Sequence, residues 1–149
     1  MNKPYLNLSN ARNKKQKDRM EKINKDNICP FCPKNILKYH KRPIIKKGKW
    51  WILTPNDFPY KGTSIHFLAI YKKHIKNISK VSSGASKELM DLFNEIVLEN
   101  KIKGGSLFLR FGDTDYTGGT VEHLHAHLIS GGIKQKNKKS IKVKLGFFK

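Results

Sequence analysis

The sequence predicts a small α+β domain with a mostly antiparallel sheet, one main amphipathic helix and a basic N-terminal segment. Short apolar runs separated by Pro and Gly turn signals predict the strands. One longer stretch, residues 84–100, has apolar side chains at spacings of three and four and predicts the helix. The chain has 149 residues, about the length of one domain, which is enough to bury a hydrophobic core.

The composition is strongly basic. The chain has 31 Lys and Arg against 11 Asp and Glu, a formal net charge of +20. Such a positive surface field favours anionic partners, including nucleotides, nucleic acids and acidic membranes. No apolar run approaches the roughly 18 to 20 residues of a membrane span, and the first residues lack the apolar core of a signal peptide. We therefore expect no membrane insertion and a cytoplasmic location.

The N-terminal segment is the first basic feature along the chain. Residues 10–27 are rich in lysine and have few apolar positions, and a helix there could be capped by Ser9 or Asn10. Such a stretch either contacts nucleic acid or simply faces water, as most charge runs do. We expect a basic arm or helix over residues 1–27, followed by one domain over residues 28–149.

The two cysteines of the chain, Cys29 and Cys32, are separated by two residues in a proline-flanked turn. In a reducing compartment this spacing is typical of a metal knuckle or a redox pair, not of a structural disulfide. The basic stretch that follows, residues 34–49, is predicted to be a loop.

The middle of the chain has the apolar patterns of a sheet and a helix. Residues 50–53 and 65–70 predict buried strands, and the segment between them has Pro and Gly turn signals. In the helix predicted over residues 84–100, apolar side chains lie on one face and acidic side chains lie towards the other. Residues 106–111 predict the next strand.

A histidine motif follows in residues 118–129. His123, His125 and His127 alternate with apolar residues, which predicts a strand with one wet and one buried face. Alternate side chains on a strand are roughly 6.6 Å apart, so the three imidazoles would share one face at a spacing suited to a phosphate or a metal. The motif is compatible with catalysis, with a metal site or with a polar strand face that has no chemistry. Gly118, Gly119 and Thr120 add flexible backbone and a hydroxyl beside it.

The C-terminal tail is the second basic feature. Residues 134–149 contain seven lysines and no acidic residue. Residues 141–148 alternate between apolar and basic, which predicts a lysine-rich, half-buried edge strand, and lysines on an edge oppose unwanted strand pairing.

These motifs resemble the histidine-triad (HIT) superfamily. Residues 123–129 fit its signature His-φ-His-φ-His-φ-φ at every position, where φ is apolar, and residues 66–75 are similar to its upstream stretch with two histidines eight apart. Residues 56–60 resemble the Asn-x-Tyr-Pro-Tyr loop of its dinucleoside polyphosphate hydrolases. The Cys-x-x-Cys turn matches the knuckle of its zinc-containing members. The resemblance covers residues 28–132.

Three positions depart from the family pattern. Tyr71 stands where a proline is usual, and Ile65 stands where a glycine usually precedes the first upstream histidine. Gly119 replaces a glutamine that many members have. Because that glutamine contacts phosphate or the leaving group, its loss leaves the leaving-group preference open.

The resemblance implies a nucleotidyl hydrolase or transferase that cleaves at the α-phosphate of a purine nucleotide. His125 would be the nucleophile and form a covalent nucleotidyl-histidine. His127 would bind a non-bridging phosphate oxygen, His123 would complete the triad, and Thr120 would contact phosphate or the leaving group. The two substrate classes that the motifs indicate are dinucleoside polyphosphates and nucleoside phosphoramidates.

The resemblance also implies the remaining site residues. Asn56 and Asp57 would bind ribose hydroxyls, although the pair could instead form only a turn before Pro59. His66 would lie either near the triad or as a satisfied histidine beneath the sheet.

The metal site is implied in the same way. The ligands would be Cys29, Cys32, His74 and His123, a closed Cys2His2 set of the structural zinc type. The superfamily also suggests a homodimer with a shared sheet.

Two other functions remain open. The chain could be a nucleic-acid-associated protein that acts on RNA or DNA ends, with the basic arm and tail binding phosphates. It could also be a nucleotide-binding module without turnover.

Overall fold

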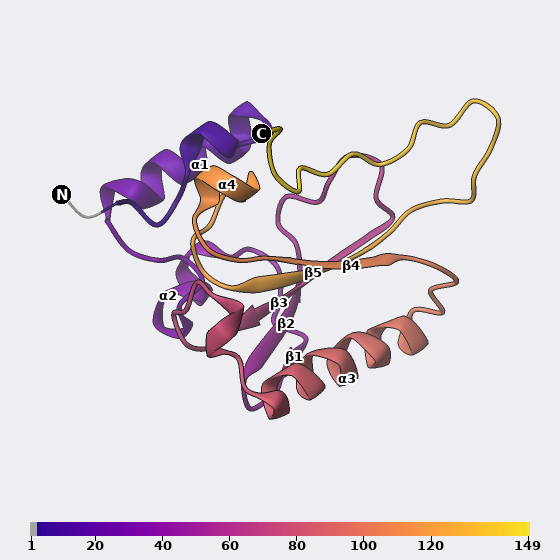
Figure 1. Ribbon diagram of the computed structural model, residues 1–149, viewed down its shortest axis with the longest axis horizontal. Coiled ribbons are helices and arrows are strands. Elements are labelled where there is room, and N and C mark those ends of the chain that lie inside the picture. Colours follow the sequence, from indigo (N-terminus) through magenta and orange to yellow (C-terminus); the bar gives the residue numbers. More distant parts are fainter. Residues whose placement is uncertain (1–2) are drawn as a thin grey trace.

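The computed structural model describes residues 3–149 and is organised around a five-stranded antiparallel sheet in the order β1-β2-β3-β5-β4 (Figure 1). Met1 and Asn2, the start of the predicted N-terminal segment, lie outside the described residues. The α+β class is confirmed. The strands are β1 (Lys46–Lys47), β2 (Trp51–Pro55), β3 (Ile65–Tyr71), β4 (Ser106–Arg110) and β5 (His125–Ser130).

Strand β5 lies inside the sheet, between β3 and β4. Its register with β3 pairs His125 with Ile70 and His127 with Leu68. On its other side, the same two histidines pair with Arg110 and Phe108 of β4. Strands on both sides therefore fix the positions of the two histidines.

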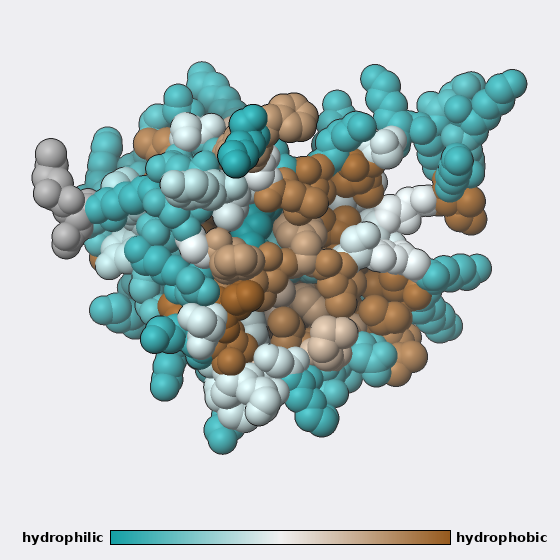
Figure 2. Space-filling model, viewed as in Figure 1, coloured by the Kyte–Doolittle hydropathy of each residue, from teal (hydrophilic) through white to brown (hydrophobic). Residues whose placement is uncertain are grey.

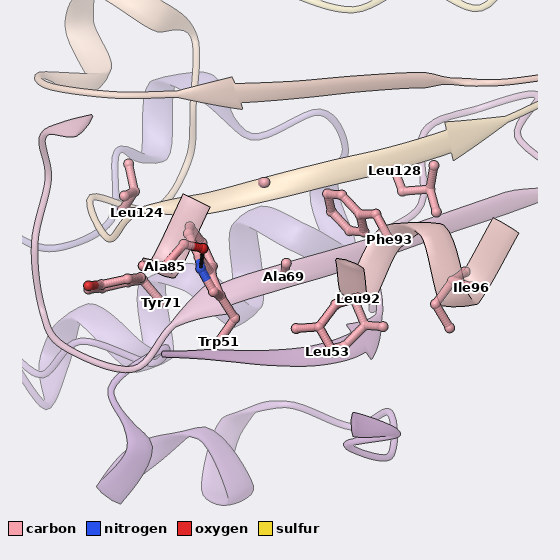
Figure 3. Packing of buried hydrophobic residues seen from close by; sticks show 11 residues of the cluster. Trp51, Leu53, Ala69, Tyr71, Ala85, Leu92, Phe93, Ile96, Leu124 and Leu128 are labelled. Atoms are coloured by element: carbon pink, nitrogen blue, oxygen red, sulfur yellow. Dashed lines mark hydrogen bonds between the residues drawn. The ribbon is translucent and has the colours of Figure 1, made fainter. Parts of the chain in front are cut away.

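Helix α3 (Ser83–Glu99) covers one face of the sheet, as its apolar face predicts, and begins where Ser82 accepts a hydrogen bond from Ala85 N. The main core lies between this helix and the sheet (Figure 3). Trp51 is fully buried there, and its indole Nε1 donates to Ala85 O at 2.8 Å. The largest contributors from the helix are Leu92, Phe93 and Ile96.

The N-terminal third of the chain supplies a second layer of packing. Ile36 packs against Ile52, Leu68 and Ile70 of the sheet. Leu6, Met20 and Ile23 form a further cluster with Val121 at its edge. The helical segments of this layer are a 3₁₀ turn (Leu8–Asn10), α1 (Lys14–Lys25) and α2 (Pro33–Tyr39); α4 (Thr114–Thr117) and a second 3₁₀ turn (Ile78–Lys80) occur later in the chain.

The prediction that the histidine face of the strand is exposed to water is wrong. Every residue of β5 is buried, and His123 precedes the strand instead of lying in it. The alternation of His and apolar residues is real, but Phe31 and Tyr60 from distant segments pack against the imidazoles. A period-two pattern cannot reveal a cover supplied by other parts of the chain.

Two local predictions in the first 50 residues are also wrong. Residues 34–49 are not a loop, because Pro33 starts α2 at a position where its missing N–H costs nothing, and β1 follows. Helix α1 is capped by Asn13, which accepts from Gln16 N. Asn10 instead donates to Gly119 O at 2.8 Å and so ties the N-terminal segment to the loop before the histidines.

The predicted strand over residues 141–148 is absent, since none of residues 131–149 is in a helix or strand. Ile141, Val143 and Leu145 line a groove along β4 and the end of β5, which accounts for the alternation. The tail is held there by the Arg110 guanidinium, which donates to Lys144 O, and not by a backbone ladder. Among residues 3–149, no helix is long and apolar enough to cross a membrane.

Candidate functional site

A cluster of two cysteines and two histidines lies at the start of the histidine motif. The ligand atoms of Cys29, Cys32, His74 and His123 are all within 4.8 Å of one another. His123 Nδ1 lies 3.3 Å from Cys29 Sγ and 3.2 Å from His74 Nδ1. The structure thus brings together the four predicted ligands from three separate segments.

The hydrogen bonding of His123 suits this cluster to a cation. Nε2 of His123 lies 2.6 Å from Tyr71 O, and because a carbonyl only accepts, Nε2 has the proton. Nδ1 is therefore an unprotonated lone pair that faces the other three ligand atoms. Burial raises the pKa of the Cys29 thiol to about 12, whereas a coordinated metal would deprotonate it. Two soft sulfur and two imidazole ligands with this carbonyl support are typical of a closed zinc site.

His125 presents one nitrogen to a pocket. Its Nδ1 donates to His123 O at 2.6 Å, so Nε2 of the neutral ring has a lone pair. Burial is the main cause that lowers the pKa of His125, to about 4, and keeps the ring neutral near pH 7. Phe31 packs edge-on against this ring at 5.0 Å. His125 can therefore act as a nucleophile without first losing a proton.

His66 and His127 form a hydrogen-bonded relay. Tyr60 N donates to His66 Nδ1 at 3.1 Å, which leaves the proton of a neutral His66 on Nε2. That Nε2 donates to His127 Nδ1 at 2.9 Å. The proton of a neutral His127 is therefore on its Nε2. Asn56 Nδ2 also lies 3.1 Å from His66 Nε2, but the backbone N–H of Tyr60 cannot rotate and fixes the tautomer.

The relay ends on an unpartnered donor. His127 Nε2 is buried and has no hydrogen-bond partner among the described residues. Burial is also the main cause of the strong lowering of the His127 pKa, so the ring stays neutral. Buried polar groups in proteins nearly always have a partner, and an exception indicates a function or a missing ligand. Here the N–H is suited to a ligand oxygen beside the Nε2 lone pair of His125.

Two arginines that the sequence reasoning missed border the same pocket. Arg110 Nη1 donates to the Tyr60 hydroxyl at 2.9 Å, and the Arg12 guanidinium lies 4.3 Å from the Tyr60 ring centroid. Both charges help to lower the pKa of His127. Arg110 could have been recognised from the sequence, because it is the one charged residue in the run Leu107–Phe111. Arg12 had none within the lysine-rich segment.

The other predicted site residues also line this pocket, but their side chains differ in availability. Thr120 lines the same pocket as His125 and His127. Asn56 Oδ1 accepts from Phe58 N, which holds its amide against the His66 ring. The Asp57 carboxylate is already used, because it pairs with Arg19 at 2.7 Å and accepts from the backbone N–H groups that follow His40. The contacts of Asn56 and Asp57 with ribose stay a prediction.

Comparisons with known proteins agree with this geometry. Residues 29–142 match the family described as "Scavenger mRNA decapping enzyme C-term binding". A HIT family hydrolase from Clostridium thermocellum has a similar structure, with 30% identity, a TM-score of 0.54 and coverage of 74% of this chain and 95% of that one. No curated protein matches the chain.

Two more distant structures share the fold. A histidine triad nucleotide-binding protein from Sulfolobus tokodaii is 24% identical, with a TM-score of 0.55 and coverage of 81% and 82%. A Zn-bound histidine triad family protein from Mycobacterium smegmatis is 16% identical, with a TM-score of 0.56 and coverage of 78% and 81%. With the family match over residues 29–142 and the triad geometry, these findings show that the chain belongs to the histidine-triad superfamily.

Proposed function

We propose that this protein is a nucleotidyl hydrolase or transferase that cleaves at the α-phosphate of a nucleotide through a covalent intermediate on His125. The observation that carries the proposal is that two imidazole nitrogens lining one pocket have opposite roles. His125 Nε2 offers a lone pair, while His127 Nε2–H is a donor that has no partner within residues 3–149. Nucleophilic attack on phosphorus needs both a free electron pair and a fixed donor for the developing oxyanion.

The proposed reaction proceeds in two displacements. The Nε2 lone pair of His125 forms a bond to phosphorus, and the bond to the leaving group breaks with its electrons on the leaving atom. The imidazole then bears a positive charge, which the carbonyl of His123 stabilises through the Nδ1–H bond. Water attacks the nucleotidyl-imidazole and the electron pair returns to Nε2. The leaving group takes up one proton and the water releases one.

The neighbouring residues favour an anionic leaving group. Arg110 and Arg12 place two cations at the rim of the pocket in which Thr120 lies. Their charge would stabilise a departing phosphate chain, as in dinucleoside polyphosphates and mRNA cap structures, more than the amine of a phosphoramidate. The match to the decapping-enzyme family supports the same class.

Zinc is the proposed cofactor. Cys29, Cys32, His74 and His123 would hold it, and with four protein ligands it would supply structural cross-linking and no open coordination position. The Zn-bound relative from Mycobacterium smegmatis supports this assignment. Through His123 O, which accepts from His125 Nδ1, the site would also orient the nucleophile.

Turnover of small donors tests the proposal. Three proteins would be compared: the wild type, His125→Ala, and Met90→Ala as a control at an exposed position outside the core. Each would be incubated with a dinucleoside tetraphosphate, a cap dinucleotide and adenosine phosphoramidate. We expect hydrolysis by the wild type and the control, fastest for the polyphosphates, and none by His125→Ala. Nucleotide binding without turnover of any donor would contradict the proposal and indicate a binding module.

A further inference from the structure

A second cavity, lined mainly by α1 and the end of α2, adjoins the triad pocket. It is a groove of about 960 Å³, at the upper end of the roughly 300–1,000 Å³ that ligand pockets occupy. Four residues line both cavities, namely Arg19, Ile23, Tyr39 and Phe58. These four residues form the boundary between the groove and the pocket that His125 and His127 line.

The groove is lined by an excess of cations. Six Lys and Arg side chains border it against two acidic ones: Lys14, Lys15, Arg19, Lys22, Lys38 and Lys41 against Asp18 and Asp26. Asp26 is already engaged by the Tyr39 hydroxyl and Lys38. Within residues 3–149, four of the lysines form no ion pair: Lys14, Lys15, Lys22 and Lys41. Figure 2 shows the hydrophilic surface over the α1 side of the molecule.

Two aromatic rings lie where the groove meets the pocket. The Arg19 guanidinium lies 5.3 Å from the Phe58 ring centroid, and Lys38 Nζ lies 5.0 Å from that of Tyr39. Tyr39 and Phe58 are both half-buried residues. Grooves that bind single-stranded nucleic acid combine cations that follow the backbone with aromatic rings on which bases stack.

We propose that the groove binds a single-stranded oligonucleotide whose end lies in the triad pocket. The free lysines contact successive phosphates, and Tyr39 and Phe58 receive the bases next to the terminal nucleotide. The direction of the strand towards His125 rests on the proposed function, but binding in the groove does not. The lysines of the tail loop, around the turn at residues 136–137, contribute little, because this loop lies at the opposite end of the molecule from α1 (Figure 1).

The test compares two charge reversals of equal size. Lys14→Glu/Lys22→Glu changes the groove, and Lys136→Glu/Lys138→Glu makes the same change in net charge on the tail. Binding of 3′-fluorescein-labelled oligo(dA), single-stranded or in a duplex, is measured by fluorescence anisotropy over a range of salt concentrations. Thermal unfolding of each variant verifies that it is folded.

The salt slope gives the expected size of the effect. Each phosphate contact on a single strand contributes about 0.7 to the slope of log affinity against log salt, so two lost contacts lower the slope by about 1.4. Extrapolated to 1 M salt, this corresponds to a loss of about 25-fold in affinity at 0.1 M. The tail variant is expected to change affinity by less than threefold.

The outcomes separate this inference from the proposed function. Loss of affinity in the groove variant alone supports the groove, whether or not the wild type hydrolyses small nucleotide donors. Equal losses in both variants, binding to the duplex as tight as to the single strand, or no binding by the wild type would overturn it. Tight oligo(dA) binding without any small-donor hydrolysis would overturn only the proposed function.

Discussion

The hydrogen-bonded relay from Tyr60 through His66 to His127 predicts that kcat/KM depends on where residue 66 places its hydrogen-bond donor. His66→Ala removes the donor to His127 Nδ1, a bond of 2.9 Å between buried rings. Leaving a buried polar group unsatisfied costs about 1 to 3 kcal/mol. If that cost falls on the donor that binds the phosphate oxygen, kcat/KM drops by about 5- to 150-fold, at about 1.36 kcal/mol for each factor of ten.

Two amide substitutions make this prediction sharper. The amide nitrogen of Gln occupies about the position of His Nε2, whereas that of Asn occupies about the position of Nδ1. His66→Gln can therefore still donate to His127, and His66→Asn cannot. We expect His66→Gln to recover most of the activity that His66→Ala loses and His66→Asn to recover little.

The assay combines kinetics with a direct observation of the proton. Steady-state hydrolysis of a dinucleoside tetraphosphate gives kcat/KM, and ¹⁵N NMR of labelled histidine gives the tautomer of His127. The wild type and His66→Gln should have the His127 proton on Nε2. Equal activity of His66→Gln and His66→Asn, or a His127 proton on Nδ1 in the wild type, would refute the relay.

Three further predictions concern metal, pH and packing. The purified chain should contain one zinc by elemental analysis, and Cys29→Ala should lose both the metal and several kcal/mol of stability, since metal binding is coupled to folding; a Cys29–Cys32 disulfide with no zinc would contradict this. Burial lowers the pKa of His66 to about 3, below the unfolded value near 6.5. The unfolded state therefore binds more protons between these values, and stability must fall as the pH drops from 6.5 towards 3, by up to about 1.36 kcal/mol per pH unit. Urea unfolding at pH 7 and pH 5 should show a smaller pH-dependent loss for His66→Gln than for the wild type, and equal losses would oppose the assignment. Phe93→Ala should destabilise the protein by about 3 to 5 kcal/mol, because Phe93 is 2% exposed, whereas Met90→Ala on the exposed face, at 55%, should change stability by less than about 0.5 kcal/mol.

The sheet and its main helix could be predicted because the residue pattern within each segment indicates its secondary structure. The helix predicted over residues 84–100 is observed as Ser83–Glu99, and the strand predicted over 106–111 as Ser106–Arg110. In both cases the spacing of apolar residues within the segment is sufficient to predict the element. The HIT signature could be recognised for the same reason, since its residues are contiguous.

The errors occur where distant segments decide the outcome. The burial of the histidine face of β5 depends on Phe31 and Tyr60, which no pattern within residues 118–129 can reveal. The tail alternates like a strand, but Arg110 holds it through a side chain. The histidine tautomers follow from single backbone contacts, such as Tyr60 N to His66, and these exist only in the folded chain.

The covalent intermediate on His125 is the central claim, and mass spectrometry after an alkaline denaturing quench tests it most directly, because the phosphorus–nitrogen bond of a nucleotidyl-histidine is cleaved in acid and persists in base. The wild type would be mixed with a dinucleoside tetraphosphate or a nucleoside phosphoramidate, quenched within one turnover and digested to locate any adduct. A covalent mechanism on His125 predicts one nucleotidyl group on the peptide that contains His125, and none in His125→Ala. Undiminished turnover by His125→Ala, or rapid wild-type turnover with no adduct at any quench time, would contradict it.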